Sequence, residues 1–77
     1  MAKHIVDIKI KNNAMALRKE YKLSRAKVAE LCGITYGAYY SIEKGKAIPN
    51  LKTAFAIAKA LNVRIDKLFY VSIYEKY

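Results

Sequence analysis

The sequence predicts a small, compact all-α domain of five short helices, with a short β-strand at each end. Three features support this prediction. Apolar residues recur at helical spacing between Ser24 and Gly45 and again between Leu51 and Leu61, whereas residues 4–11 and 70–77 alternate between apolar and polar. With 77 residues, the chain has room for one modest hydrophobic core. We therefore expect residues 1–77 to form a single domain.

The two ends of the chain are predicted to be strands. In residues 4–11, the β-branched residues Val6, Ile8 and Ile10 alternate with charged ones. Asn12-Asn13 ends the pattern. The tail alternates in the same way around Val71 and Ile73. We expect the extensions 1–12 and 70–77 to pair as a small antiparallel sheet, within one chain or across a dimer. Because a two-stranded ribbon alone is marginal in water, it should pack on the helices or join a partner's edge.

The first helix is expected to follow an N-cap at Asn13 and to end near Tyr21. Leu17 lies on its inward face, and Met15 and Tyr21 are further candidates for burial. Leu23 is placed to pack beside the start of the second helix.

Residues 24–43 are predicted to form two short helices that meet at a tight turn. The apolar positions that fit this arrangement are Val28, Cys32, Ile34, Tyr39 and Ile42. Steeply crossed helices need a small residue where their backbones approach, here Ala29, and often a Gly where the first helix ends in a left-handed conformation, here Gly33. Ser24 and Thr35 are expected to cap the two helices.

The second of these helices has two distinct faces when its residues are placed about 100° apart. Tyr39 and Ile42 lie on the face that packs inward. The opposite face is free to contact another molecule, and it carries Tyr36, Gly37, Tyr40 and Ser41.

Two further helices complete the prediction. Pro49 fixes a turn and Asn50 caps the fourth helix, whose buried face is expected to consist of Leu51, Ala54, Phe55, Ile57, Ala58 and Leu61. A short fifth helix is expected over residues 65–69, with Asp66 favourably placed near its N-terminus.

Charge predicts the kind of partner. The chain carries a net charge of +9, and residues 1–27 hold eight Lys or Arg against two acidic residues. A small basic domain indicates a polyanion as its partner. The alternative is that these charges form an ordinary solvated surface.

Other functions find little support in the sequence. The single Cys32, in apolar surroundings, is predicted to be a buried structural thiol. No apolar run approaches the roughly 20 residues of a membrane span, and a signal-peptide pattern is lacking, so we expect a cytoplasmic protein that does not contact membranes. The lone His4 and the lack of any catalytic or metal-ligand spacing predict no enzyme activity, metal, cofactor or small-molecule ligand.

About two thirds of the chain resembles the lambda-repressor-like helix-turn-helix family, the Cro and Xre type of bacterial and phage regulators. The matching stretches are LRKEYKLS from Leu17, IEKGKAIPNL from Ile42, AIAKALNV from Ala56 and IDKLF ending at Phe69. The resemblance implies a five-helix DNA-binding fold with the helix-turn-helix at residues 24–43. The strand-like residues 1–12 depart from the family, most of whose members begin with the first helix. Arg64 also departs from it, because Ser or Thr often precedes the fifth helix.

The resemblance also implies roles for individual residues. It places the second helix of the pair in the major groove of DNA, where Tyr36, Gly37, Tyr40 and Ser41 would contact base edges. Residues at positions that contact the DNA backbone are Arg25, Thr35, Lys44 and Lys46, with Asn50 contributing a backbone amide and Lys27 as a weaker candidate. A structural ion pair is implied between Arg18 and Glu43.

Each of these roles has a plainer alternative. Gly37 could simply avoid a clash inside the protein, and the tyrosines could serve packing or dimerisation. The lysines could be ordinary solvated surface residues.

The sequence therefore predicts a regulator of transcription, expected to be a repressor that binds a palindromic double-stranded DNA operator as a homodimer. Two other functions stay open. One is a protein-interaction module, such as an antitoxin-like partner. The other is non-specific binding of RNA or an anionic membrane through charge alone.

Overall fold

The two ends of the chain meet in one antiparallel ribbon, and five helices lie between them. The computed structural model describes residues 5–76, with the side chains of residues 8–72. Strand β1 (Ile5–Asn12) pairs with strand β2 (Phe69–Lys76), and the helices are α1 (Ala14–Glu20), α2 (Arg25–Cys32), α3 (Tyr36–Glu43), α4 (Leu51–Ala60) and α5 (Ile65–Leu68). The expected pairing of the terminal strands is thus confirmed within one chain for residues 5–12 and 69–76, whereas residues 1–4 and 77 of the predicted extensions lie outside the described residues.

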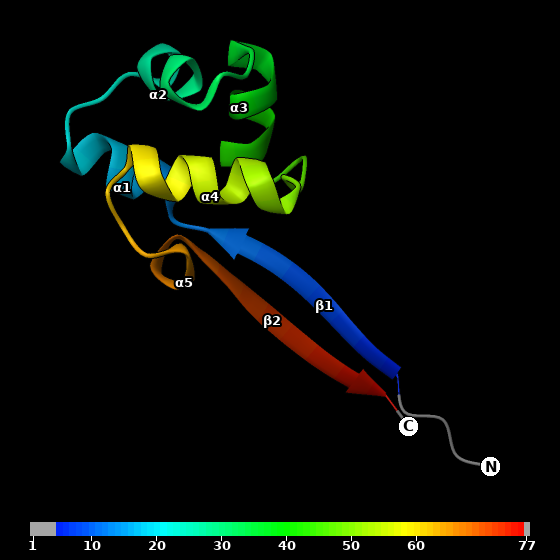
Figure 1. Ribbon diagram of the computed structural model, residues 1–77. Coiled ribbons are helices and arrows are strands. Elements are labelled where there is room, and N and C mark those ends of the chain that lie inside the picture. The colour runs from blue at the N-terminus through cyan, green and yellow to red at the C-terminus, as the bar shows by residue number, and fades with distance from the viewer. Residues whose placement is uncertain (1–4, 77) are drawn as a thin grey trace.

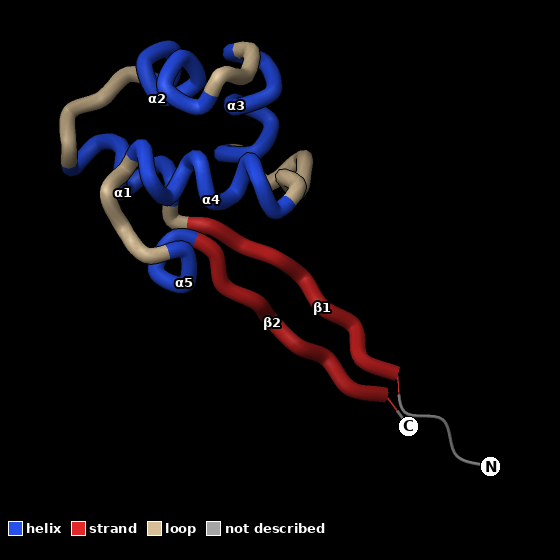
Figure 2. Tube along the Cα trace, viewed as in Figure 1, coloured by secondary structure: helices blue, strands red, loops and turns tan. Residues whose placement is uncertain are grey.

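The ribbon makes the prediction of an all-α fold only partly correct. Each strand is eight residues long, and beyond its base the ribbon projects away from the helices instead of lying across them (Figure 1). Figure 2 shows the resulting division, with all helices at one end and both strands at the other. The helical body agrees with the expected five-helix arrangement.

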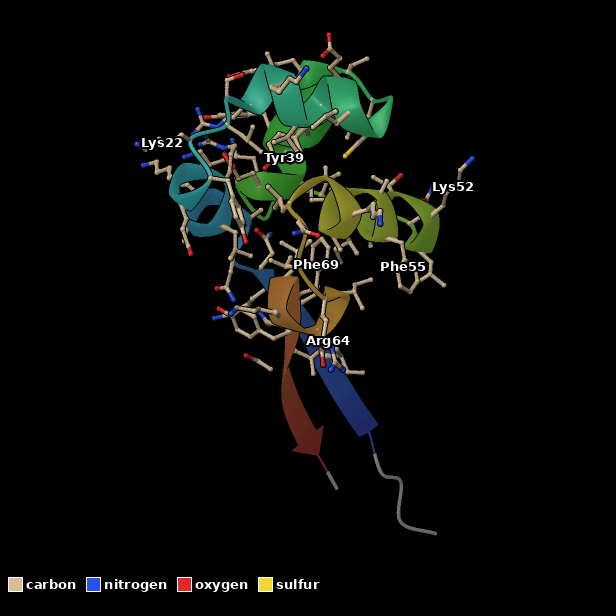
Figure 3. All side chains as sticks on the ribbon, turned by 60° about the vertical axis from the view of Figure 1, so that its left-hand side comes forward. Lys22, Tyr39, Lys52, Phe55, Arg64 and Phe69 are labelled. Atoms are coloured by element: carbon tan, nitrogen blue, oxygen red, sulfur yellow. The ribbon has the colours of Figure 1, made fainter. Side chains whose placement is uncertain are left out.

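The helices enclose a small hydrophobic core. Tyr39 is fully buried among them, as Figure 3 shows, and Val28, Ile57 and Leu68 are equally inaccessible to solvent. The other members of the core are Ala14, Leu17, Ala29, Ile42, Ala58 and Leu61. Cys32 packs against this core but is only partly buried, so the expectation of a buried thiol is half correct. Its burial nevertheless raises the pKa of the thiol.

The joint between ribbon and helices differs from the prediction. Asn13 does not cap α1 with its side chain; instead its Nδ2 donates to the carbonyl of Lys67, and its backbone N–H donates to the carbonyl of Leu68. Asn12 takes over the capping role, since its Oδ1 accepts from the N–H of Ala14 at 3.0 Å. The predicted N-cap position at Asn13 is therefore confirmed, but the capping side chain is that of Asn12. Leu17 of α1 is buried as expected, whereas Tyr21, just after the helix, is exposed.

Helix α4 begins with the expected cap, because Asn50 Oδ1 accepts from the N–H of Thr53 at 2.8 Å. Its predicted buried face is partly wrong, since Leu51 and Phe55 are 70% and 53% exposed. Figure 3 shows Phe55 on the outer side of the helix. The remaining positions of that face are buried, and they are Ala54, Ile57, Ala58 and Leu61.

Helix α5 is a single turn without a side-chain cap at Arg64. Arg64 instead donates to Asp66 across the exposed start of the helix. Within the described residues 5–76, no helix is long and apolar enough to cross a membrane.

Candidate nucleic-acid interface

Helices α2 and α3 meet at the turn that the sequence predicted. Ser24 Oγ accepts from the N–H of Lys27 at 3.0 Å, and Thr35 Oγ1 accepts from the N–H of Ala38 at 3.1 Å. Between them, Gly33 has a φ of 69°, the left-handed conformation in which a side chain is strained. The two caps and the glycine therefore fix where each helix begins and where the first one ends.

The buried side of α3 determines what its other side presents. Tyr39 and Ile42 face the core, so the opposite stripe turns outward, with Tyr36 and Gly37 exposed and Tyr40 and Ser41 half-buried. The four residues predicted to read bases therefore share one accessible face of this helix.

Aromatic rings and cationic groups gather on that face. The rings of Tyr36 and Tyr40 are stacked, with centroids 6.2 Å apart and planes 14° from parallel. The Arg25 guanidinium carbon lies 5.2 Å from the Tyr40 centroid, and Lys44 Nζ lies 5.6 Å from it. These distances are within the range of cation–π attraction. The ring of Tyr40 thus holds one positive group from α2 and one from the end of α3.

Beneath this face lies a buried carboxylate. Glu43 has a fully inaccessible side chain, and its Oε1 accepts from Arg18 Nε at 2.7 Å and from the Tyr39 hydroxyl at 3.0 Å. Arg18 also donates to the carbonyl of Leu23 at 2.9 Å. The pair implied by the family resemblance is therefore present, and it ties α1 to α3.

Arg25 is the partner that the sequence did not reveal. Its Nε donates to Glu43 Oε2 at 2.5 Å, so the carboxylate binds two guanidinium groups. This bond is made by Nε, and the Arg25 side chain stays 26% exposed. The clue in the sequence was a second arginine at the first position of α2.

The network sets the ionisation of its members. Burial opposes ionisation of Glu43, yet the hydrogen bonds from Arg18, Arg25 and Tyr39 outweigh it and lower the pKa of the carboxyl. The bond to Glu43 in turn raises the pKa of Arg25. Burial and the neighbouring Glu43 raise the pKa of Tyr39, which therefore keeps its proton and donates.

The loop after α3 is also fixed by the helix. The N–H groups of Lys46 and Ala47 both donate to the carbonyl of Ser41, at 2.8 and 3.2 Å, and Gly45 turns the chain with a φ of 76°. Lys44 and Lys46 are exposed there. They form, with Arg25, a positive border around the exposed face of α3.

The remaining candidates for DNA-backbone contacts, Lys27, Thr35 and Asn50, lie in other settings. Lys27 Nζ is paired with Glu30 at 3.0 Å on the exposed side of α2, so part of its charge is compensated. Asn50 and Thr35 use their side-chain oxygens as caps. The Thr35 hydroxyl still has its hydrogen to donate.

Gly37 is helical and has free space around it. A Cβ built at this position would meet nothing within 4 Å. The interpretation that Gly37 avoids a clash inside the protein is therefore wrong.

An exposed helix of this kind, set by a capped turn and bordered by cationic side chains, defines a DNA-binding helix-turn-helix protein. The model of the helix-turn-helix family matches residues 15–68. The chain belongs to this family, the Cro and Xre type of transcriptional regulators.

Relatives cover most of the chain. A helix-turn-helix-type transcriptional regulator of Methanocaldococcus jannaschii is 38% identical over 66 residues, which are 86% of this chain and 96% of that protein. The regulator YgzD of Bacillus subtilis is 32% identical over 62 residues, covering 80% and 94% of the two chains. The cryptic phage CTXphi transcriptional repressor RstR of Vibrio cholerae is 33% identical over 61 residues, covering 79% of this chain and 54% of that protein.

The fold has a counterpart among solved structures. The restriction-modification controller protein C.AhdI from Aeromonas hydrophila matches with a TM-score of 0.67 and 24% sequence identity, over 70% of this chain and 82% of that one. This likeness shows the fold.

Proposed function

We propose that this chain is a transcriptional repressor that binds a palindromic duplex operator as a homodimer. Each copy would place α3 in the major groove of one half-site, and the half-sites would lie about one helical turn apart. The observation that supports this proposal most is the exposed face of α3, bordered by Arg25, Lys44 and Lys46. A relative named as a phage transcriptional repressor supports repression as the direction of regulation.

Within this proposal, contacts divide into two groups. Arg25, Lys44 and Lys46 bind phosphates and set the position of the helix, while Tyr36, Gly37, Tyr40 and Ser41 contact base edges. Ser41 can exchange hydrogen bonds with several bases, and the tyrosine rings can pack on thymine methyl groups. Glu43 contributes indirectly, because its bond to Nε orients Arg25, whose partly exposed guanidinium would contact a phosphate.

The test is selection of bound duplexes from a randomised pool at about 150 mM salt, near physiological ionic strength. The natural chain is compared with the double variant Tyr40→Ala, Ser41→Ala. The control is Lys59→Ala, which removes an exposed charge from α4, away from the proposed interface.

We expect the natural chain and the control to select the same palindrome, and the double variant to lose or alter it. A non-palindromic consensus would contradict the homodimer. Binding without any enrichment, which merely weakens steeply with salt, would leave only non-specific attraction to phosphate.

A further inference from the structure

The base of the ribbon and the start of α4 carry an exposed apolar surface. We define the apolar surface as the six described side chains Ile8, Ile10, Ile48, Leu51, Phe55 and Val71. Each of them is between 40% and 70% exposed. Scattered exposed hydrophobics are ordinary, but a contiguous group of this kind marks an interaction site.

The strand register, a groove and the spacing along α4 connect the six side chains. Ile10 lies opposite Val71, and Ile8 lies two residues further along the same face of the ribbon. An open groove of about 230 Å³ then joins the ribbon to the helices, and its lining residues are Ile10, Ile48, Pro49, Leu51, Ala54, Ile65 and Phe69. Phe55 lies one turn beyond Leu51 on α4.

The ribbon is held firmly at its base but is unsupported beyond it. Asn12 Nδ2 donates to the carbonyl of Ile42 at 3.0 Å, and Asn13 donates twice to the end of α5. Within residues 5–76, the sheet consists of these two strands only. Since a two-stranded ribbon is marginal in water, its exposed apolar face needs a cover.

We propose that a second copy of this chain covers the apolar surface, and that this contact forms the homodimer on which the proposed function rests. Charge favours this occupant. None of the six residues is charged. Two copies, each with a net charge of +9, can therefore meet there without bringing like charges together at the contact. An acidic partner would instead prefer the opposite ribbon face, which carries Lys9 and Lys11.

The surface also suits a two-fold contact. In such a dimer the same patch is used by both copies, so it must complement itself, and opposed rows of β-branched side chains do so by interdigitating. The contact leaves DNA accessible, because α2 and α3 lie on the far side of α4 from the ribbon (Figure 1).

The experiment compares neighbouring residues on opposite ribbon faces. Val71→Glu places a charge on the apolar surface, while Ser72→Glu adds the same charge on the other face, opposite Lys9. Leu51→Glu tests the helical part, and a carboxylate in the first turn of α4 favours the helix. Molecular mass is followed by sedimentation equilibrium, and binding to a single half-site of the selected operator is measured for each variant.

We expect the natural chain and Ser72→Glu to be dimers at tens of micromolar. Val71→Glu and Leu51→Glu should each raise the Kd of the dimer about tenfold or more, as loss of a well-buried interface contact does. Both should keep their helical circular dichroism and their affinity for the half-site.

Three results would overturn the assignment. Unchanged dimerisation of both Val71→Glu and Leu51→Glu, with the palindrome still selected, would leave the proposed function standing and place the dimer contact elsewhere. Equal weakening by Ser72→Glu and Val71→Glu would show that the apolar face is not what the second copy contacts. A natural chain that stays monomeric on a palindromic operator would instead contradict the homodimer itself.

Discussion

The Glu43 carboxylate holds three helices together at the level of single atoms. It accepts from Arg18 of α1, Arg25 of α2 and Tyr39 of its own helix, and its side chain is closed to solvent. Removing it by Glu43→Ala would leave the 9% exposed Arg18 with an uncompensated charge. We expect a loss of about 3–5 kcal/mol in the free energy of unfolding, the usual cost of breaking a buried pair from one side. Urea denaturation measures it.

The matched control is Glu30→Ala, which removes the carboxylate of the exposed Lys27–Glu30 pair. Surface pairs of this kind contribute roughly 0–1 kcal/mol. Similar losses for Glu43→Ala and Glu30→Ala would show that the buried network contributes no more than a surface ion pair.

The same carboxylate makes stability depend on pH. Its pKa is lower in the folded chain than in the unfolded one, so the folded state binds the proton less tightly. The stabilisation is present at neutral pH and above about 4.3, the ordinary pKa of Glu, and it is lost as pH falls through the lowered folded pKa. We expect Glu43→Gln to flatten this acid-induced decline in melting temperature relative to Glu30→Gln. Parallel declines in the two variants would contradict the assignment.

At the scale of elements, α3 contains Gly37, a glycine that packing within the protein does not require. Because a Cβ at Gly37 meets nothing within 4 Å, Gly37→Ala should stabilise the domain by about 0.5–1 kcal/mol through helix propensity alone. The same methyl group would stand on the face proposed to enter the groove. We therefore expect weaker binding to the selected operator together with a higher melting temperature. Ala38→Gly, on the same helix, is the reverse change, and a variant Gly37→Ala with unchanged affinity would show that close approach is not required.

The positive border can be separated from the base-contacting residues by salt. Lys44→Ala should weaken binding to all duplexes and reduce the slope of log K against log salt by about one, since one phosphate contact is lost. Lys59→Ala should leave the slope unchanged. Filter binding between low and physiological salt measures both slopes, and an unchanged slope for Lys44→Ala would place that side chain away from phosphate.

The elements that the sequence predicted well are those specified by local rules. The caps at Ser24, Thr35 and Asn50 and the left-handed Gly33 depend on neighbouring residues alone, and all four are confirmed. The α4 face was misjudged at its edge. At 100° per residue, Phe55 lies well to one side of the stripe centred on Ala54, Ile57, Ala58 and Leu61, so its side chain stays 53% exposed.

Contacts between distant segments were harder to foresee. The side chain of Asn12 caps α1 and that of Asn13 binds the end of α5, because the ribbon brings the two residues against Ile42 and α5. Local patterns do not reveal these contacts. The bond from Arg25 to Glu43 likewise joins residues 18 apart through the crossing of α2 and α3. In both cases the tertiary fold, and not the local sequence, sets the hydrogen-bond partners of the side chains.

At the scale of the whole molecule, the ribbon gives the protein an elongated shape, 51 × 21 × 18 Å along its principal axes. Its small helical core is at one end, and the exposed apolar surface lies where the ribbon joins the helices. A domain of this size buries only a modest share of its surface, so covering that face with a second copy adds stability that the single chain lacks.

The proposed dimer therefore predicts that thermal stability depends on concentration. When unfolding also separates two chains, each tenfold rise in protein concentration adds about 1.4 kcal/mol to the free energy that heat must overcome. For two 77-residue chains with an unfolding entropy of about 2.1 cal/mol/K per residue, the melting temperature should rise by roughly 4 °C per tenfold. Val71→Glu should lose most of this dependence and Ser72→Glu should keep it. Calorimetric scans over a hundredfold range would decide, since a melting temperature of the natural chain that is independent of concentration belongs to a monomer.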